Sequence, residues 1–85
     1  MRRRGRTDRN HAEIRDALRA RGWKVVSLAD VGGGVPDLLI WRPGKRIRLI
    51  EVKAEHGALT DDQQTFLMEG WPVTIVRSVE EALRV

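Results

Sequence analysis

The sequence predicts an α/β domain whose elements follow one another in the order α-β-β-β-α-β-α. Two apolar runs of strand length, residues 35–41 and 48–52, flank the turn signal Pro43-Gly44. Helix-capping patterns at residues 60–63 and 78–81 mark the beginnings of two later helices. With 85 residues the chain has room for one thin core, so we expect a single domain over residues 10–85 behind a basic arm at residues 1–9.

The remaining elements follow from local signals along the chain. The first helix is expected from a cap at Thr7 or Asp8 to about Arg21, where Gly22 ends it. Its inward stripe consists of Ile14, Ala17, Leu18 and Arg21, with the arginine at the edge. The other expected elements are strands at residues 23–28 and 72–76 and a final helix at about 79–84, which docks through Val79, Ala82 and Leu83.

Three charged side chains interrupt the apolar material of the two central strands: Asp37, Glu51 and Lys53. A buried carboxylate is costly unless a partner compensates it, and two carboxylates about 5 Å apart repel by roughly 3 kcal/mol at an effective dielectric near 20. A divalent cation between them would remove this repulsion, and hard oxygen ligands favour Mg²⁺ or Mn²⁺. Because strand residues alternate, Glu51 and Lys53 share a face, which would put an ammonium group beside metal-bound water. The pattern favours metal-dependent phosphodiester chemistry.

The register of the two central strands decides whether the carboxylates can meet. A strict two-residue turn at Pro43-Gly44 would place Asp37 opposite Ile50, and Glu51 would point to the other face. A shared site therefore requires an odd number of connecting residues or a bulge. In that register the opposite face carries only apolar side chains, namely Leu38, Ile40, Ile50 and Val52.

Three consecutive glycines, residues 32–34, lie directly ahead of the first central strand. They are not a phosphate-binding P-loop, because no helix with Gly-Lys-Ser/Thr follows. We expect them to allow left-handed backbone dihedrals or the close approach of backbone to a ligand.

Several short motifs occur in the order found in one nuclease family. Pro36-Asp37 followed by Glu51-Val52-Lys53 resembles the motif of the PD-(D/E)xK nuclease superfamily. The resemblance extends to its small, stand-alone VRR-NUC branch of phages and bacteria through Gly34-Val35, Leu59-Thr60-x-x-Gln63, residues 73–78 and an early helix with Glu13. It covers most of residues 10–83 and implies a restriction-endonuclease-like core, with a mixed sheet flanked by helices.

The resemblance also implies a role for each matching residue on the central strands. Asp37 and Glu51 would bind the metal ion, aided by the Val52 carbonyl. Lys53 would orient the nucleophile or stabilise the phosphorus under attack. The metal would lower the pKa of bound water and stabilise charge on the scissile phosphate.

Side chains outside the central strands have competing interpretations. The family places a glutamate on the first helix, so Glu13 would ligate the metal or hold a water; otherwise it is a surface residue in a helical ion pair. The family also places a glutamine near the site, so Gln63 is a catalytic candidate; otherwise it caps the helix by reaching the Thr60 N–H. Gln64 replaces it if the register slips by one. His56 is close enough in sequence to assist, although a solvated loop histidine is the commoner case.

The excess positive charge lies at the N-terminus. Residues 2–9 carry five arginines against one aspartate, whereas residues 10–85 carry 11 basic and 11 acidic residues. Such an arm is typical of chains that bind phosphate backbones, and the alternative is a solubilising tail. The candidate nucleic-acid-binding residues are Arg2, Arg3, Arg4, Arg6 and Arg9.

These observations lead to one hypothesis and several rivals. We expect a Mg²⁺- or Mn²⁺-dependent endonuclease that hydrolyses phosphodiester bonds in DNA, and the resemblance adds a homodimer selective for branched DNA such as four-way junctions. The rivals are a nucleic-acid-binding module without cleavage, a monomeric non-specific nickase and an α/β interaction domain. The chain has no cysteine and no long apolar segment, so we expect no disulfide or membrane contact and a cytoplasmic location in a bacterial or phage-infected cell.

Overall fold

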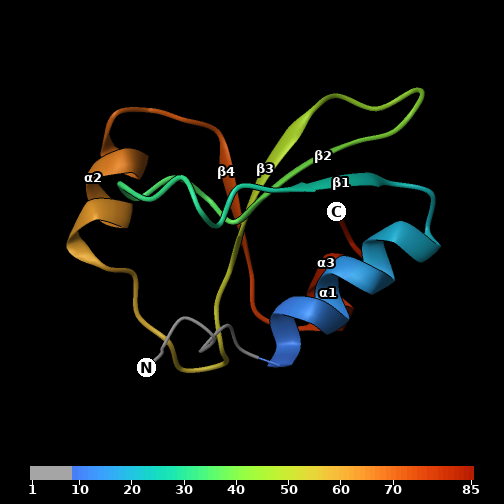
Figure 1. Cartoon of the computed structure of the whole chain (residues 1–85), viewed down its shortest axis with the longest axis horizontal. Helices are drawn as coiled ribbons and strands as arrows, with labels where there is room; N and C mark the ends of the chain where they lie inside the picture. The colour runs from blue at the N-terminus through green and yellow to red at the C-terminus, as the bar shows by residue number, and fades with distance from the viewer. Residues whose placement is uncertain (1–8) are drawn as a thin grey trace.

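The computed structural model describes residues 9–85 and contains the elements in the predicted order (Figure 1). No helix among these residues has the length and apolar character that crossing a membrane requires. The architecture is α/β with a four-stranded mixed sheet, as predicted. The elements are α1 (Arg9–Ala20), β1 (Lys24–Ser27), β2 (Leu38–Trp41), β3 (Arg48–Val52), α2 (Asp61–Met68), β4 (Val73–Val76) and α3 (Val79–Ala82).

The strands lie side by side in sequence order, with β1, β2 and β3 antiparallel and β4 parallel to β3. Leu38 pairs with Ile50 and Ile40 with Arg48, so an odd number of residues connects the last pair. One step beyond Leu38 and Ile50, this register sets Asp37 opposite Glu51. The prediction of an odd connection is therefore confirmed, and it brings both carboxylates to one face of the sheet.

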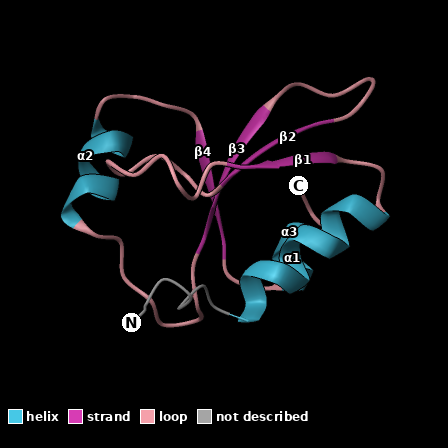
Figure 2. Ribbon diagram, viewed as in Figure 1, coloured by secondary structure: helices cyan, strands magenta, loops and turns pink. Residues whose placement is uncertain are grey.

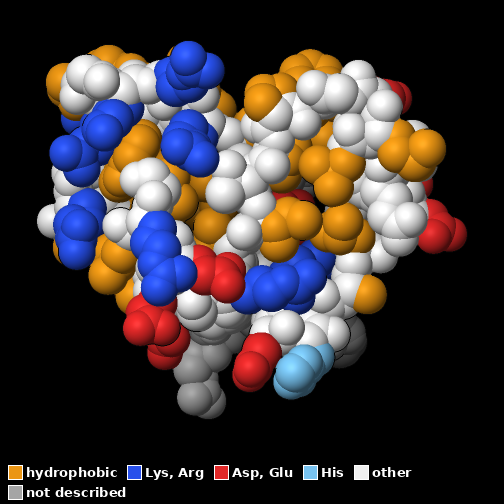
Figure 3. All heavy atoms as spheres, turned by 180° about the vertical axis from the view of Figure 1, so that it is seen from behind, with side chains coloured by type: hydrophobic (Ala, Val, Ile, Leu, Met, Phe, Trp, Pro, Cys, Tyr) orange, Lys and Arg blue, Asp and Glu red, His pale blue; other side chains and the backbone are white. Residues whose placement is uncertain are grey.

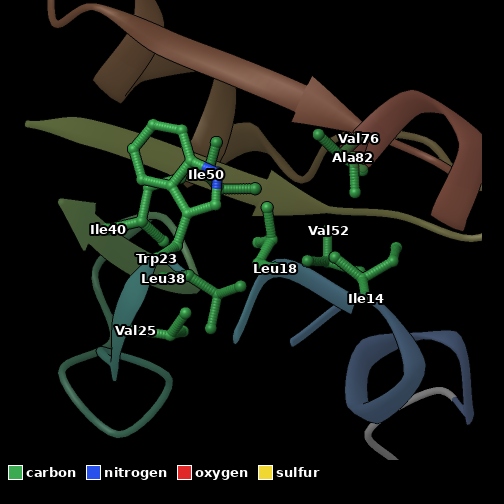
Figure 4. Packing of buried hydrophobic residues seen from close by; sticks show 10 residues of the cluster. All are labelled: Ile14, Leu18, Trp23, Val25, Leu38, Ile40, Ile50, Val52, Val76 and Ala82. Carbon is green, nitrogen blue, oxygen red and sulfur yellow. The ribbon is translucent and has the colours of Figure 1, made fainter. Parts of the chain in front are cut away.

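Helices α1 and α3 cover the other face and form the core with it (Figures 1 and 4). Ile14 and Leu18, on the predicted stripe of α1, are fully buried against the sheet. The four strand residues predicted to line this face are all in the core. The buried cluster consists of Ile14, Leu18, Trp23, Val25, Leu38, Ile40, Ile50, Val52, Val76 and Ala82.

Helix α2 lies alone on the carboxylate side of the sheet (Figure 2). None of its side chains is fully buried, in contrast to those of α1. Phe66 and Leu67 are half-buried over a small cavity that Glu51 also lines. The sheet is therefore tightly packed on one face and only partly covered on the face that carries the carboxylates.

The C-terminal helix differs from the prediction in its length, docking and cap. It ends at Ala82, and Leu83 is 37% exposed, whereas Val85 packs against the core. Residues 78–81 form only half of a capping box: Ser78 Oγ accepts the Glu81 N–H, but the Glu81 carboxylate accepts the Arg77 N–H. The backbone N–H of Arg77 thus takes the place of the Ser78 N–H as the partner of Glu81.

Candidate active site

The backbone of β3 binds the carboxylate of Asp37 directly. Asp37 Oδ2 accepts the Val52 N–H at 2.9 Å, while the Asp37 carbonyl accepts the Leu28 N–H at 2.7 Å. Pro36, which precedes it, is fully buried and limits the backbone at this position. The side chain is therefore fixed across the β2–β3 pair, beside the carboxylate on the neighbouring strand.

Glu51 is the buried charged residue of the described chain, with 3% of its surface exposed. Burial, followed by charge repulsion from Asp37 and a hydrogen bond with it, raises the pKa of the Glu51 carboxyl to about 8 against the opposing effect of Lys53. Glu51 therefore holds its proton near neutral pH when no cation is present. A divalent cation would replace that proton and relieve the repulsion.

Lys53 directly follows β3, and its side chain lies beside that of Glu51, as the alternation of strand residues predicted. Its Nζ is 3.8 Å from Glu51 Oε2, and 15% of the side chain is exposed. The loop after it is held by Arg77, whose Nη1 donates to the carbonyls of Ala54 and Gly57 at 2.8 and 2.7 Å. Nothing in the sequence pattern marked Arg77 for this contact, because a basic residue after a strand has no distinctive spacing.

Gln63 makes both of the contacts that the sequence offered as alternatives. Its Oε1 accepts the Thr60 N–H at 2.9 Å, and Thr60 Oγ1 accepts the Gln63 N–H at 3.1 Å, which completes the predicted capping box. Its Nε2 donates to Glu51 Oε2 at 3.1 Å. Gln64 is exposed and donates to the Leu59 carbonyl instead. The cap thus sets the direction of an amide that binds the buried carboxylate.

Gly34 lets α2 approach this closely. Its φ is +84°, in the left-handed region that the glycine run predicted, and a Cβ at this position would lie 2.2 Å from the carbonyl oxygen of Asp62. The neighbouring Gly33 also has a positive φ, but nothing lies within 4 Å of its Cβ position. The close approach at Gly34 is that of the α2 backbone, whereas the sequence suggested the approach of a ligand.

Asn10 ties the beginning of α1 to the ends of two strands. Its Nδ2 donates to the Lys53 carbonyl at 3.1 Å and to the Arg77 carbonyl at 3.4 Å. Sequence reasoning missed this residue, because an asparagine in the first turn of a helix is common and its partners are distant along the chain. These two contacts place the beginning of α1 beside the C-terminal ends of β3 and β4.

Other predicted site residues are not brought to the carboxylate pair. Glu13 is exposed on α1, the helix that covers the opposite face, and residues 9–85 contain no group of three His, Asp or Glu side chains arranged to hold a metal ion. The side chain of His56 is 91% exposed beside Glu55. Arg9 is the first residue of α1. The other predicted arm residues, Arg2, Arg3, Arg4 and Arg6, lie outside the described part.

The donor set at this end of the sheet suits a hard divalent cation. Asp37 and Glu51 offer carboxylate oxygens from neighbouring strands, and Mg²⁺ is commonly bound by one or two carboxylates with water and substrate phosphate. The Val52 N–H donates to Asp37, and the Val52 carbonyl stays a predicted ligand of the metal ion. The cavity between Glu51 and α2 has a volume of about 10 Å³, which leaves room for at most a water-sized group.

The comparisons with known proteins agree with this geometry. No curated protein and no solved structure gives a significant match. The family model of the VRR-NUC domain, a nuclease-type domain, matches residues 5–77, which include the carboxylate pair, Lys53 and Gln63. The match spans most of the sequence, and the chain belongs to the VRR-NUC family.

Proposed function

We propose that this chain is a Mg²⁺- or Mn²⁺-dependent endonuclease that hydrolyses phosphodiester bonds in DNA. The observation that carries the proposal is the carboxylate pair at the β2–β3 junction, where burial and Asp37 raise the pKa of Glu51 to about 8 with the Lys53 ammonium 3.8 Å away. An acid pair with a purely structural role would not need a buried position beside a second carboxylate. A cation site, in contrast, gains affinity when two carboxylates are held close together, because the bound cation relieves their repulsion.

Each side chain has a distinct task in the proposed reaction. Asp37 and Glu51 hold the metal ion, which when bound lowers the pKa of a water and neutralises charge on the phosphate. Lys53 orients the attacking oxygen or stabilises the pentavalent phosphorus. Gln63 holds Oε2 of Glu51 through its amide, so that the carboxylate keeps one orientation.

The test is cleavage of labelled DNA with Mg²⁺, Mn²⁺, Ca²⁺ or chelator. Glu51→Gln, Asp37→Asn and Lys53→Met should each abolish cutting while the fold persists. Glu55→Gln is the matched control, because Glu55 is an exposed acid in the loop after the same strand. Cutting that survives chelation, or that Glu51→Gln leaves within tenfold of the wild-type rate, contradicts the proposal and favours a binding module.

We further propose that the working unit is a homodimer that acts on branched DNA. The support is the size of the described domain and its two sheet edges, β1 and β4, which a second copy could cover. A two-fold dimer carries two sites and would make paired incisions in a four-way junction. Light scattering at micromolar protein, beside cleavage of an immobile junction and its linear arms, tests this. A monomeric mass, or equal rates on junction and linear duplex, favours a monomeric nickase.

A further inference from the structure

Part of the sheet face that carries the carboxylates is not covered by α2. Three large apolar side chains on β1, on β2 and ahead of β3 are exposed here: Val26 at 54%, Trp41 at 40% and Ile47 at 63%. Val26 pairs with Leu39, two residues before Trp41, and Ile47 directly precedes β3, where the Ile40–Arg48 register carried one residue further would set it opposite Trp41. They therefore form one continuous patch.

Basic side chains surround this patch. Residues 41–48 contain four basic residues and no acidic one, and Lys24 pairs with Trp41 across β1 and β2. Arg42 is already engaged, because it donates to the Arg21 carbonyl and lies 5.4 Å over the ring of Trp23. The exposed basic residues around this patch are Lys24, Lys45 and Arg46. On the face in Figure 3, Lys and Arg side chains gather over the side that carries the β2–β3 hairpin, away from the side of α2.

An open groove adjoins the patch. It has a volume of about 630 Å³ and is lined by Arg46, Ile47, Arg48, Pro72, Val73 and Thr74. Arg48 pairs with Ile40 and Thr74 with Ile50, so the hydrogen bond of 3.0 Å from Arg48 to Thr74 Oγ1 lies on the face opposite Trp41, and the groove meets the patch at the edge formed by Ile47. The outline of the molecule is notched between the hairpin and the segment that leads from α2 into β4 (Figure 3). The groove and the patch thus share Ile47.

We propose that this surface, the hairpin platform (Lys24, Val26, Trp41, Arg46 and Ile47), binds a single-stranded nucleic acid segment that leads away from the active site, with one base stacked on Trp41. The inference rests on the proposed nuclease function, and it identifies how the unpaired strand is held. Exposed aromatic rings within basic grooves bind single strands in this way, because every base offers a stacking face and the phosphates meet the cations.

The platform is continuous with the active site. Asp37 and Trp41 point to the same face of β2, four residues and about 13 Å apart at the usual strand rise. A strand whose phosphate lies at the carboxylate pair therefore reaches Trp41 within a few nucleotides. The apolar Leu39 lies between them and is half-buried, so no charged group of β2 interrupts the path.

A second copy of the chain fits this surface less well. In a two-fold interface the same patch meets itself, so Lys24, Lys45 and Arg46 would approach their own equivalents. Like charges brought together in this way oppose association. A polyanion satisfies the same groups, which is why the observations favour nucleic acid as the occupant.

The test measures binding apart from cleavage. A fluorescein-labelled oligothymidylate is titrated with the full chain in chelator, and anisotropy reports the affinity. Trp41→Ala should weaken binding by about 5- to 100-fold, the loss that removal of one base–aromatic stack brings. Trp41→Phe should stay within a few-fold of wild type. Trp71→Ala is the matched control, because Trp71 is 50% exposed but stacks on Phe66 beyond α2. A Lys24→Ala/Arg46→Ala double variant should reduce the slope of log K against log[salt] by about 0.7 per lost phosphate contact.

Each outcome separates the platform from the nuclease assignment. If wild-type protein cleaves DNA but Trp41→Ala binds the oligonucleotide as tightly as wild type, the platform is wrong and the nuclease function stands. If Trp41→Ala loses affinity but wild-type protein cleaves nothing with either metal, the platform stands and the proposed reaction is wrong. A change of molecular mass in Trp41→Ala, with unchanged oligonucleotide affinity, would assign the surface to a second copy and overturn the proposal.

Discussion

The amide of Gln63 joins helix α2 to the buried carboxylate of Glu51. Its Nε2 donates to Glu51 Oε2 at 3.1 Å, while its Oε1 accepts the N–H of the cap residue Thr60 at 2.9 Å. One side chain therefore both begins the helix and orients the acid that we propose binds the metal ion. Because α2 has no fully buried side chain, this contact and the approach at Gly34 set the position of the helix over the site.

Replacement of Gln63 by glutamate separates its two tasks. A glutamate still accepts the Thr60 N–H as in the usual capping box, but it cannot donate to Glu51 and adds a like charge there. We expect Gln63→Glu to lower activity or metal affinity by about 10- to 100-fold, as loss of a partner of a metal ligand does elsewhere. Thr60→Ala is the control: it should cost about 1 kcal/mol of stability through the cap and leave metal affinity nearly unchanged. Equal metal affinity in Gln63→Glu and wild type, by calorimetry, would contradict this role.

Gly34 and Gly33 form a matched pair for the packing of α2. Both have a positive φ, so an alanine at either position is strained by about 1–2 kcal/mol. Only at Gly34 would the added Cβ meet the backbone of Asp62, at 2.2 Å. Gly34→Ala should therefore lower the free energy of unfolding by about 1–3 kcal/mol more than Gly33→Ala does. It should also reduce cleavage, because the displaced α2 carries Gln63 with it. Urea unfolding and cleavage rates measure both effects, and equal losses in the two variants would show that α2 does not depend on this approach.

The raised pKa of Glu51 predicts how metal-free stability depends on pH. The folded state holds the proton up to about pH 8, whereas the unfolded state releases it near 4.5. The stabilising effect of the neutral acid is thus fully present below pH 4.5 and is lost as the pH rises to about 8. We expect unfolding in chelator to become easier over this window, and Glu51→Gln to remove most of the slope and be the more stable protein at pH 8. Mn²⁺ should stabilise wild-type protein most at the alkaline end. A Glu51→Gln variant with the wild-type slope would contradict this explanation.

The central strands were predictable from the sequence because burial and chemistry constrained the same residues. Only a register that left Leu38, Ile40, Ile50 and Val52 on one face could also pair Asp37 with Glu51, so two independent requirements selected one arrangement. The position of α2 had no such constraint. Its few apolar residues gave a weak pattern, and its place was set by backbone contact at Gly34, which no periodicity records.

Side chains that bind backbone carbonyls were not predictable for a related reason. Asn10 and Arg77 contact residues 20 or more positions away, and neither type is rare on a surface. Glu13 shows the opposite case: its spacing next to the inward stripe of α1 suggested the site, but its side chain is exposed on the helix over the other face. Helix periodicity specifies which side of a helix faces inward, and it leaves open which end of the sheet the helix borders.

We expect the arginine arm to contribute to the affinity for DNA and not to the rate of cleavage. Changing Arg2, Arg3, Arg4 and Arg6 to glutamine keeps the length of the chain and removes up to four phosphate contacts. The slope of log K against log[salt] for duplex DNA should become shallower by as much as about 3–4, at roughly 0.9 per contact. Cleavage at saturating DNA should stay near the wild-type rate, because the proposed catalytic side chains all lie within residues 37–63. Measurement in chelator from low to moderate salt gives the slope, and the hairpin platform variants provide the comparison on the same DNA. An unchanged slope would show that the arm only adds charge to the chain, and that the contacts that hold duplex DNA lie within residues 9–85.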